Sequence, residues 1–208
     1  MTLLLDAVQR LEETIFGSGC EDGAAVLRRD PGVPRCQFER GADLLASFGG
    51  RTARVVTSAP VQTSTRLSSL FGREFTGPEE RTAALGIVNA ASGFLCLSRR
   101  LHACDPGCHG ACLAGLKEEI DDRRPFSPVQ VPVISREFSA NLAEDPAAAG
   151  VLLVTGEALI LEEGGDLAGR AAVGGFLLLG PSTAGVAALL GLPHWCPYGR
   201  LDAGAGGH

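Results

Sequence analysis

Two short apolar runs near the carboxyl end of the chain, VLLV and FLLL, constrain the fold more than any other feature. Each run follows glycine and leads into a segment with helical spacing. Because strands without polar alternation are buried on both faces, such runs predict a parallel sheet covered by helices on both sides. We therefore expect a Rossmann-like domain over residues 128–200, with three or more parallel strands. Two of these strands should end near Thr155 and Leu179.

Other segments of this half follow from the same alternation. Residues 129–135 (VQVPVIS) are predicted as a strand, 136–146 as a helix, 182–191 as a second helix and 193–199 as a short closing segment. The stretch 121–128 is rich in charge and proline, which predicts a domain boundary there. The glycine-rich residues 201–208 predict a disordered tail.

The first half of the chain predicts a smaller α+β domain over residues 1–121. Apolar residues at helical spacing predict an amphipathic first helix over residues 1–16. Residues 23–30 and 50–59 are predicted as strands, and 40–50 as a short helix that ends at two glycines. Pro78, preceded by Thr76 and Gly77 as possible caps, predicts the start of another helix. The fold class is thus α/β, an α+β domain followed by a parallel-sheet domain.

Two turns in the second half carry residues that suit a ligand site. The sequence LLLGPSTAG turns from a strand into a helix at Ser182 or Thr183, and VTGEAL makes a second such turn at Thr155. Ligands of open α/β sheets bind at the carboxyl ends of the strands, and helix amino termini favour anions. A capped turn without any ligand is the more common explanation of such a motif. The spacing matches neither a dinucleotide fingerprint nor a P-loop.

Seven cysteines form the strongest chemical signal. Cys104, Cys108 and Cys112 follow one another at a spacing of four, with His109 among them. If Asp105 caps a helix that starts at Pro106, the thiolates lie near its amino terminus, where their pKa is lowered. This arrangement predicts a site for a metal ion or an iron–sulfur cluster. Reactive or disulfide-forming thiols and simple burial remain open as alternatives.

A fourth ligand is offered by the segment PHWCPYG, which contains His194 and Cys196. Three cysteines from one segment and one from a distant loop can complete a tetrahedral sulfur site. The candidate metal ligands are therefore Cys104, Cys108, Cys112, Cys196, His109 and His194. Cys96 is expected in the core, and Cys20 and Cys36 in loops.

Charge and hydrophobicity limit the partners. The net charge of −6, with no basic stripe, argues against nucleic acid. The most apolar segment is too short to span a membrane, and residues 1–16 lack the basic start of a signal peptide. We therefore expect a cytoplasmic protein that binds a small anionic ligand or a metal ion. The sequence leaves a homodimer open.

Two stretches, ERTAALGIVNAASG and GVLLVTGEALI…GGFLLLGPSTAGVAALLG, resemble a two-domain family known for heavy-metal chelation. The resemblance covers residues 80–98 and 150–192. It implies an enolase-N-like amino-terminal domain, a Rossmann-like carboxyl-terminal domain and a ligand cleft between them. The residues that would line this cleft are Asn89, Thr155, Gly156, Glu157, Gly180, Pro181, Ser182 and Thr183. The segments CDPGCHGAC and HWCPYG depart from the family pattern and favour an iron–sulfur or soft-metal version of it.

The sequence therefore predicts a metal- or iron–sulfur-binding protein with a small-ligand cleft, serving metal handling or cofactor maturation. One alternative is an enzyme that binds an anionic or nucleotide-like small molecule at GPSTAG and uses redox-active thiols. Another is a structural zinc protein without catalysis. No Ser–His–Asp pattern, carboxylate pair or cofactor fingerprint identifies a reaction.

Overall fold

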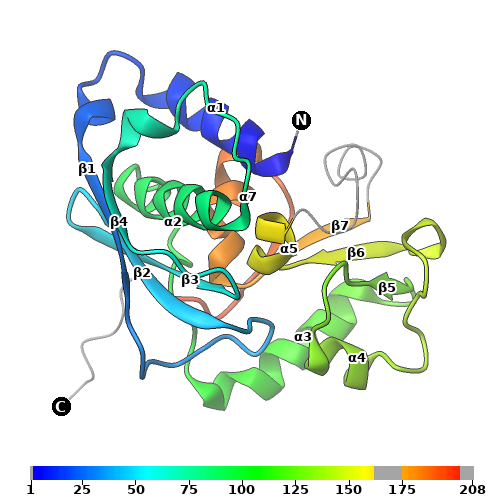
Figure 1. Cartoon of the computed structure of the whole chain (residues 1–208). Coiled ribbons are helices and arrows are strands. Elements are labelled where there is room, and N and C mark those ends of the chain that lie inside the picture. Colours follow the sequence, from blue (N-terminus) through cyan, green and yellow to red (C-terminus); the bar gives the residue numbers. More distant parts are fainter. Residues whose placement is uncertain (1, 162–174, 202–208) are drawn as a thin grey trace.

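The computed structural model of the protein describes residues 2–161 and 175–201. It contains an antiparallel sheet of order β3-β2-β1-β4 and a parallel sheet of order β5-β6-β7-β8 (Figure 1). The predicted α/β class, with an α+β part followed by a parallel sheet, is confirmed. Within the described ranges, no helix has the length and apolar character that crossing a membrane requires. The predicted tail lies outside the described residues, except for Leu201.

The antiparallel sheet contains the two strands predicted in the first half, β1 (Ala24–Arg29) and β3 (Arg51–Thr57). The predicted helix over residues 40–50 is wrong, because this segment forms β2 (Ala42–Phe48). Gly49 and Gly50 have φ angles of +55° and +78° and join β2 to β3 as a two-residue hairpin turn. Such a turn needs positive φ at both central residues, so the glycines mark a hairpin and not a helix end. The fourth strand is β4 (Thr63–Arg66).

Helix α2 (Pro78–Phe94) lies between the two sheets. It packs on β1, β2 and β3 with one side and on α5 and α7 with the other, while α1 (Leu3–Ile15) covers its flank. The predicted start is confirmed, since Pro78 follows Gly77 at the amino-terminal cap. The Glu80 carboxylate accepts a bond of 2.8 Å from the Thr76 amide, which closes the first turn. One core therefore extends from the antiparallel sheet to the parallel sheet.

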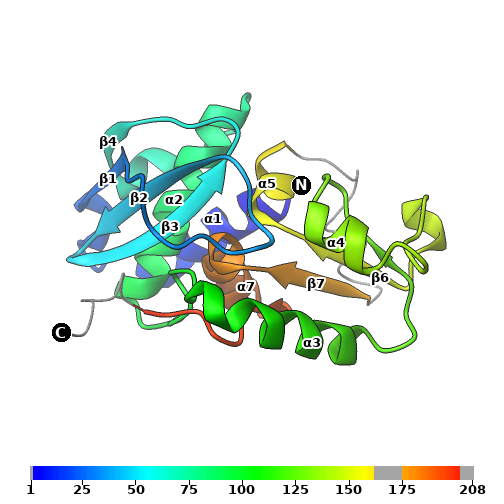
Figure 2. The same ribbon diagram turned by 90° about the horizontal axis from the view of Figure 1, so that it is seen from below.

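The parallel sheet is covered on both faces, as the apolar runs predict. In β6 (Val151–Val154) and β7 (Phe176–Leu179), Leu152 and Leu178 join the core around α2. Their neighbours Leu153 and Leu177 join a second core with α3 (His109–Ile120) and α4 (Pro132–Glu137). Figure 2 shows α3 and α4 against this second face. The predicted strand ends are confirmed, because β6 stops just before Thr155 and β7 stops at Leu179.

Two assignments in the second half need correction. The predicted strand over residues 129–135 is wrong, because Pro132 opens α4, and the strand is instead β5 (Pro125–Phe126). Proline lacks the donor that an interior strand needs and suits the first helical turn. The helix predicted over 136–146 is also wrong, since α4 ends at Glu137. The closing segment adds the short parallel strand β8 (His194–Trp195). The described residues of this half also form the helices α5 (Gly156–Leu161) and α7 (Ala184–Leu190).

Candidate functional site

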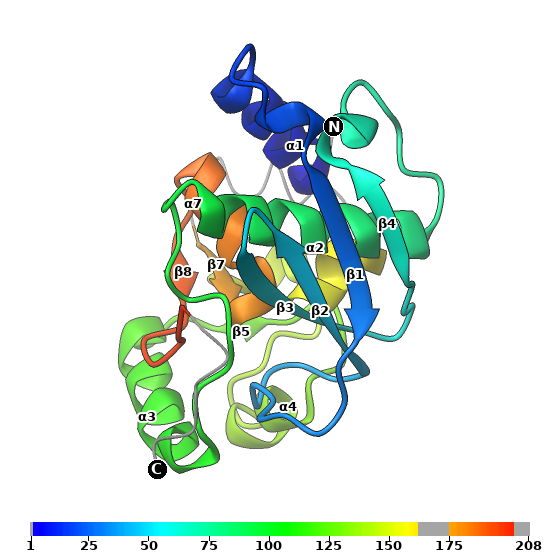
Figure 3. The ribbon, with the colours of Figure 1, turned by 90° about the vertical axis from the view of Figure 1, so that its left-hand side faces the viewer.

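Three chain segments with cysteines meet at the carboxyl edge of the parallel sheet. Cys196 directly follows β8, and the segment with Cys104, Cys108 and Cys112 leads into α3. The third segment is the β1–β2 loop, residues 30–41, which carries Cys36 and reaches from the antiparallel sheet towards this edge (Figure 3). The carboxyl edge is where open α/β sheets bind their ligands.

The thiols of these segments are close enough to act on one another. The pKa of Cys196 is raised to about 12, first by burial and then by the charges of Glu39, Cys104 and Cys112. Burial also raises the pKa of Cys36, and Glu39 and Cys196 add to that rise. We call this group the thiol cluster; its members are Cys36, Cys104, Cys108, Cys112 and Cys196.

The predicted lowering of the thiol pKa values is wrong for two of the three spaced cysteines. Burial raises the pKa of Cys104, and the neighbouring Cys108 raises it further. The pKa of Cys112 is also raised, mainly by burial. Asp105 does stand at the cap position before Pro106, as predicted, but its carboxylate pairs with Arg200 at 3.3 Å instead of bonding the turn. All seven cysteines are free, so no thiol of the cluster forms a disulfide. Cys96, predicted in the core, is exposed instead.

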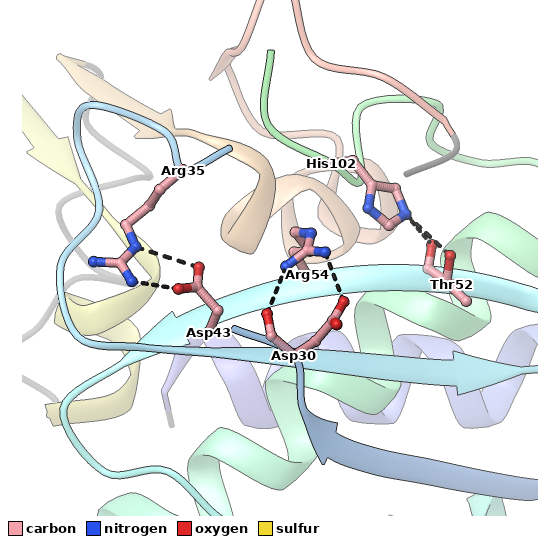
Figure 4. A network of polar contacts seen from close by, with 6 residues as sticks. All are labelled: Asp30, Arg35, Asp43, Thr52, Arg54 and His102. Atoms are coloured by element: carbon pink, nitrogen blue, oxygen red, sulfur yellow. Dashed lines mark hydrogen bonds and ion pairs between the residues drawn. The ribbon is translucent and has the colours of Figure 1, made fainter. Parts of the chain in front are cut away.

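Two ion pairs hold the β1–β2 loop in place (Figure 4). The Arg35 guanidinium, next to Cys36, donates to the carboxylate of Asp43 on β2. Arg54 on β3 is buried and donates to Asp30 Oδ2 at 2.7 Å, where the loop begins. A buried guanidinium requires such a partner. These contacts fix the start and the middle of the loop against the antiparallel sheet.

The cysteine-rich segment is fixed along the free edge of β3. His102 Nε2 lies 3.1 Å from Thr52 Oγ1 and 3.0 Å from the Thr52 carbonyl oxygen (Figure 4). The Arg54 amide donates to the Leu101 carbonyl at 2.9 Å. The Arg200 amide donates to the His102 carbonyl at 2.9 Å, so the chain after Cys196 is bound to the same segment. These bonds cover part of the backbone that an edge strand otherwise exposes.

The GPST turn does not present free amides, contrary to the prediction. The Ser182 amide donates to Glu39 Oε1 at 2.9 Å, so a carboxylate of the chain itself occupies the place expected for an anion. Ser182 Oγ accepts from the Val56 amide at 3.1 Å. Asn89 donates to the Ser182 carbonyl and accepts from the Gly185 amide, both at 2.7 Å. The predicted ligand residues Asn89 and Ser182 therefore bind the two sheets and α2 together.

The other predicted ligand residues lie in the same contact region between the two sheets. The hydroxyl of buried Thr183 donates to the Leu179 and Gly180 carbonyls, and Pro181 is buried beside it. Glu157 accepts from the Ser58 amide at 3.1 Å, which ties α5 to the end of β3. Gly156 packs so closely that an added methyl group would lie 2.6 Å from Ser182 Cβ. Thr155 Oγ1 is buried and has no hydrogen-bond partner among the described residues.

The two candidate histidines differ in what their rings offer. His194 Nε2 lies 2.9 Å from the Gly180 carbonyl, and burial lowers the pKa of this ring. His109 Nε2 is buried without a partner among the described residues. Its backbone carbonyl accepts from Gln37 Nε2 at 2.8 Å, which places His109 beside the β1–β2 loop. His109 is therefore the histidine whose Nε2 is open to a ligand.

A shallow groove of about 230 Å³ lies beside the thiol cluster. Arg99, Arg100 and His194 line it together with Ala184 and Ala187 from α7. The charge of Arg100 acts on the Cys196 thiol, so the groove and the thiol cluster are neighbours. This groove is a hollow with basic side chains at this edge of the sheet.

Sequence reasoning missed Cys36 and Glu39. A methyl group on Gly180 would lie 3.3 Å from Cys36 Sγ and 2.8 Å from Glu39 Oε1, so both side chains face the end of β7. Within residues 2–161 and 175–201, no three His, Cys, Asp or Glu side chains are placed to hold one metal ion as they stand. Compared with protein-family models, curated proteins and solved structures, the chain matches none. The resemblance to the heavy-metal chelation family stays a prediction.

Proposed function

We propose that the thiol cluster binds a soft metal centre, a zinc-type ion or an iron–sulfur cluster, in a protein of metal handling or cofactor maturation. One observation carries the proposal: five free thiols from three separate segments gather at the carboxyl edge of a parallel sheet. Cys104, Cys108, Cys112 and Cys196 are the proposed ligands, and Cys36 adds a further thiol.

The electrostatics of the cluster favour a metal over a reactive thiol. Nucleophilic and redox-active cysteines need a lowered pKa, whereas burial and neighbouring thiols raise the pKa of Cys104 and Cys196. Several buried thiolates repel one another, and a cation removes this repulsion when it replaces their protons. Binding should therefore release protons. The reducing conditions of the cytoplasm, where we place the protein, would keep such thiols available.

The groove with Arg99 and Arg100 is where we propose that a small anionic ligand binds. Neither guanidinium has an ion-pair partner among the described residues, and both line the hollow. An anion there would lie next to the metal centre. This arrangement suits a protein that binds its metal together with a small ligand.

Metal analysis of anaerobically purified protein tests the proposal. Iron with acid-labile sulfide and visible absorption would identify a cluster, and zinc in a colourless protein would identify a single ion. A Cys104→Ser/Cys108→Ser/Cys112→Ser variant should lose most of either metal. A Cys20→Ser/Cys96→Ser variant, which alters thiols outside the cluster, should keep it. Wild-type protein that takes up neither zinc nor iron and sulfide on anaerobic reconstitution would overturn the proposal, as would a triple variant with unchanged metal content.

A further inference from the structure

The side chain of Glu39 is the least satisfied charged group at this edge of the sheet. It is 6% exposed, and it lies in the β1–β2 loop. Its Oε1 accepts from the Ser182 amide at 2.9 Å, but its buried Oε2 has no hydrogen-bond partner among the described residues. Buried polar atoms are hydrogen-bonded in the great majority of cases. An orphaned carboxylate oxygen in the interior therefore indicates a missing partner.

Arg35, a basic side chain whose charge acts on Glu39, does not supply that partner. Arg35 acts on Glu39 only weakly, and its guanidinium is bound to the carboxylate of Asp43. Burying an unpaired carboxylate is costly, so the group needs either a proton or a cation. Only a bound cation would let the Glu39 carboxylate stay negatively charged in the interior.

The Glu39 carboxylate lies near two members of the thiol cluster. Glu39 raises the pKa of both Cys36 and Cys196, so its charge lies near two members of the thiol cluster. Cys36 Sγ and Glu39 Oε1 both lie within 3.3 Å of the position that a Gly180 methyl group would take. The Glu39 carboxylate and the Cys36 thiol thus share one buried region at the end of β7.

We infer that Glu39 is an oxygen ligand of the metal centre and binds the metal through Oε2 while the Ser182 amide holds Oε1. The inference rests on the proposed thiolate centre and extends its ligand set beyond cysteine. Zinc and similar ions accept carboxylate oxygen together with thiolate, at about 2.0–2.2 Å. A cation at Oε2 satisfies the orphaned atom and compensates the buried charge at once.

The inferred metal ligand gives a function to the hydrogen bonds of the GPST turn. A ligand carboxylate is usually oriented by a second group that bonds its other oxygen. Ser182 provides this group, and it is itself fixed by the Val56 amide and by Asn89. The turn positions the Glu39 carboxylate, so its function is to orient a ligand residue and not to bind a free anion.

Cobalt(II) titration under anaerobic conditions tests the inference, because its visible bands report which atoms bind the ion. Wild-type protein should show sulfur-to-cobalt charge transfer together with d–d bands. Glu39→Gln, nearly the same in shape, should keep the charge transfer, shift the d–d bands and weaken binding at least tenfold. Glu39→Asp should retain an oxygen ligand with intermediate affinity. Glu13→Gln, which alters an exposed carboxylate on α1 outside the thiol cluster, should leave the bands unchanged.

The outcomes separate the two proposals. Wild-type protein without cobalt charge transfer would overturn the thiolate centre itself. Wild-type protein with charge transfer, and Glu39→Gln with the same d–d bands and affinity, would overturn only the role of Glu39. If Glu39→Gln does not fold, Glu39→Asp decides: bands and affinity equal to those of the wild type would refute a ligand role, because a shorter arm cannot keep the same bond.

Discussion

Replacing Glu39 by glutamine should change how the stability of the metal-free protein depends on pH. The pKa of Glu39 is raised from 4.5 to about 7, mainly by burial, and the bond from Ser182 only partly offsets this rise. The folded state therefore holds this proton more tightly than the unfolded state does. Stability is highest below pH 4.5 as far as this group is concerned, and it is lost as the pH rises towards 7.

The size of the loss in the free energy of unfolding follows from the pKa shift of Glu39. A difference from 4.5 to about 7 corresponds to about 3 kcal/mol, at roughly 1.4 kcal/mol per pKa unit. Because Glu39 is fully buried, solvent screening does not reduce this value much. Glutamine carries no charge at any pH. Glu39→Gln should therefore be more stable than the wild type above pH 7 and should lack the loss between pH 4.5 and 7.

Urea unfolding followed by circular dichroism, with chelator and reductant at five pH values from 4.5 to 7.5, measures this difference. Glu137→Gln serves as the control, because its exposed carboxylate has a lowered pKa and should contribute nothing in this range. Parallel pH profiles for the wild type and Glu39→Gln would refute the reasoning. Such a result would mean that Glu39 is solvated or paired in the folded protein.

Three further substitutions test the packing of the site. Asn89→Ala should cost about 2–4 kcal/mol in urea unfolding, because it leaves two buried backbone groups without partners; a loss below 0.5 kcal/mol would contradict it. Gly180→Ala should lower the melting temperature, because the φ of Gly180 is +80° and an added methyl group would lie 2.8 Å from Glu39 Oε1. Gly191→Ala should lower it much less, because Gly191 has a φ of +63° but open space around it. Leu153→Ala should cost about 2–5 kcal/mol, because it opens a cavity beneath α3, and stability equal to the wild type would refute that burial.

The parallel sheet could be predicted because its signal is local. Both apolar runs are bounded by glycine, and their burial on two faces needs no knowledge of the rest of the chain. The prediction of secondary structure was wrong where a glycine pair or a proline is compatible with two local structures. The pair Gly49–Gly50 indicates a helix end as readily as a hairpin turn, and only the pairing of Phe48 with Arg51 settles it. Pro132 likewise ends a strand or starts a helix, and the contacts of α4 with the second core decide.

The site was predicted in part for the same reason. Cys104, Cys108 and Cys112 are visible by their spacing, and Cys196 by its place beside His194 in the closing segment. Nothing local marks Cys36 or Glu39, because the loop that carries them has no periodicity. They reach the site only because ion pairs hold that loop across the antiparallel sheet. Contacts between segments more than a hundred residues apart, such as Glu39 with Ser182, have no trace in a single sequence.

The rule that ligands bind at the carboxyl ends of parallel strands points to this edge of the sheet, but the residues there decide which charge a ligand should carry. A free helix start would favour an anion. Here Glu39 already takes the Ser182 amide, and five thiols can each become negative when they lose a proton. A second anion at the end of β7 would face like charge, whereas a cation would gain from every one of these groups. We therefore propose a metal at the edge where the strand ends and the helix start predict a small anion, and an anion in the arginine-lined groove beside it.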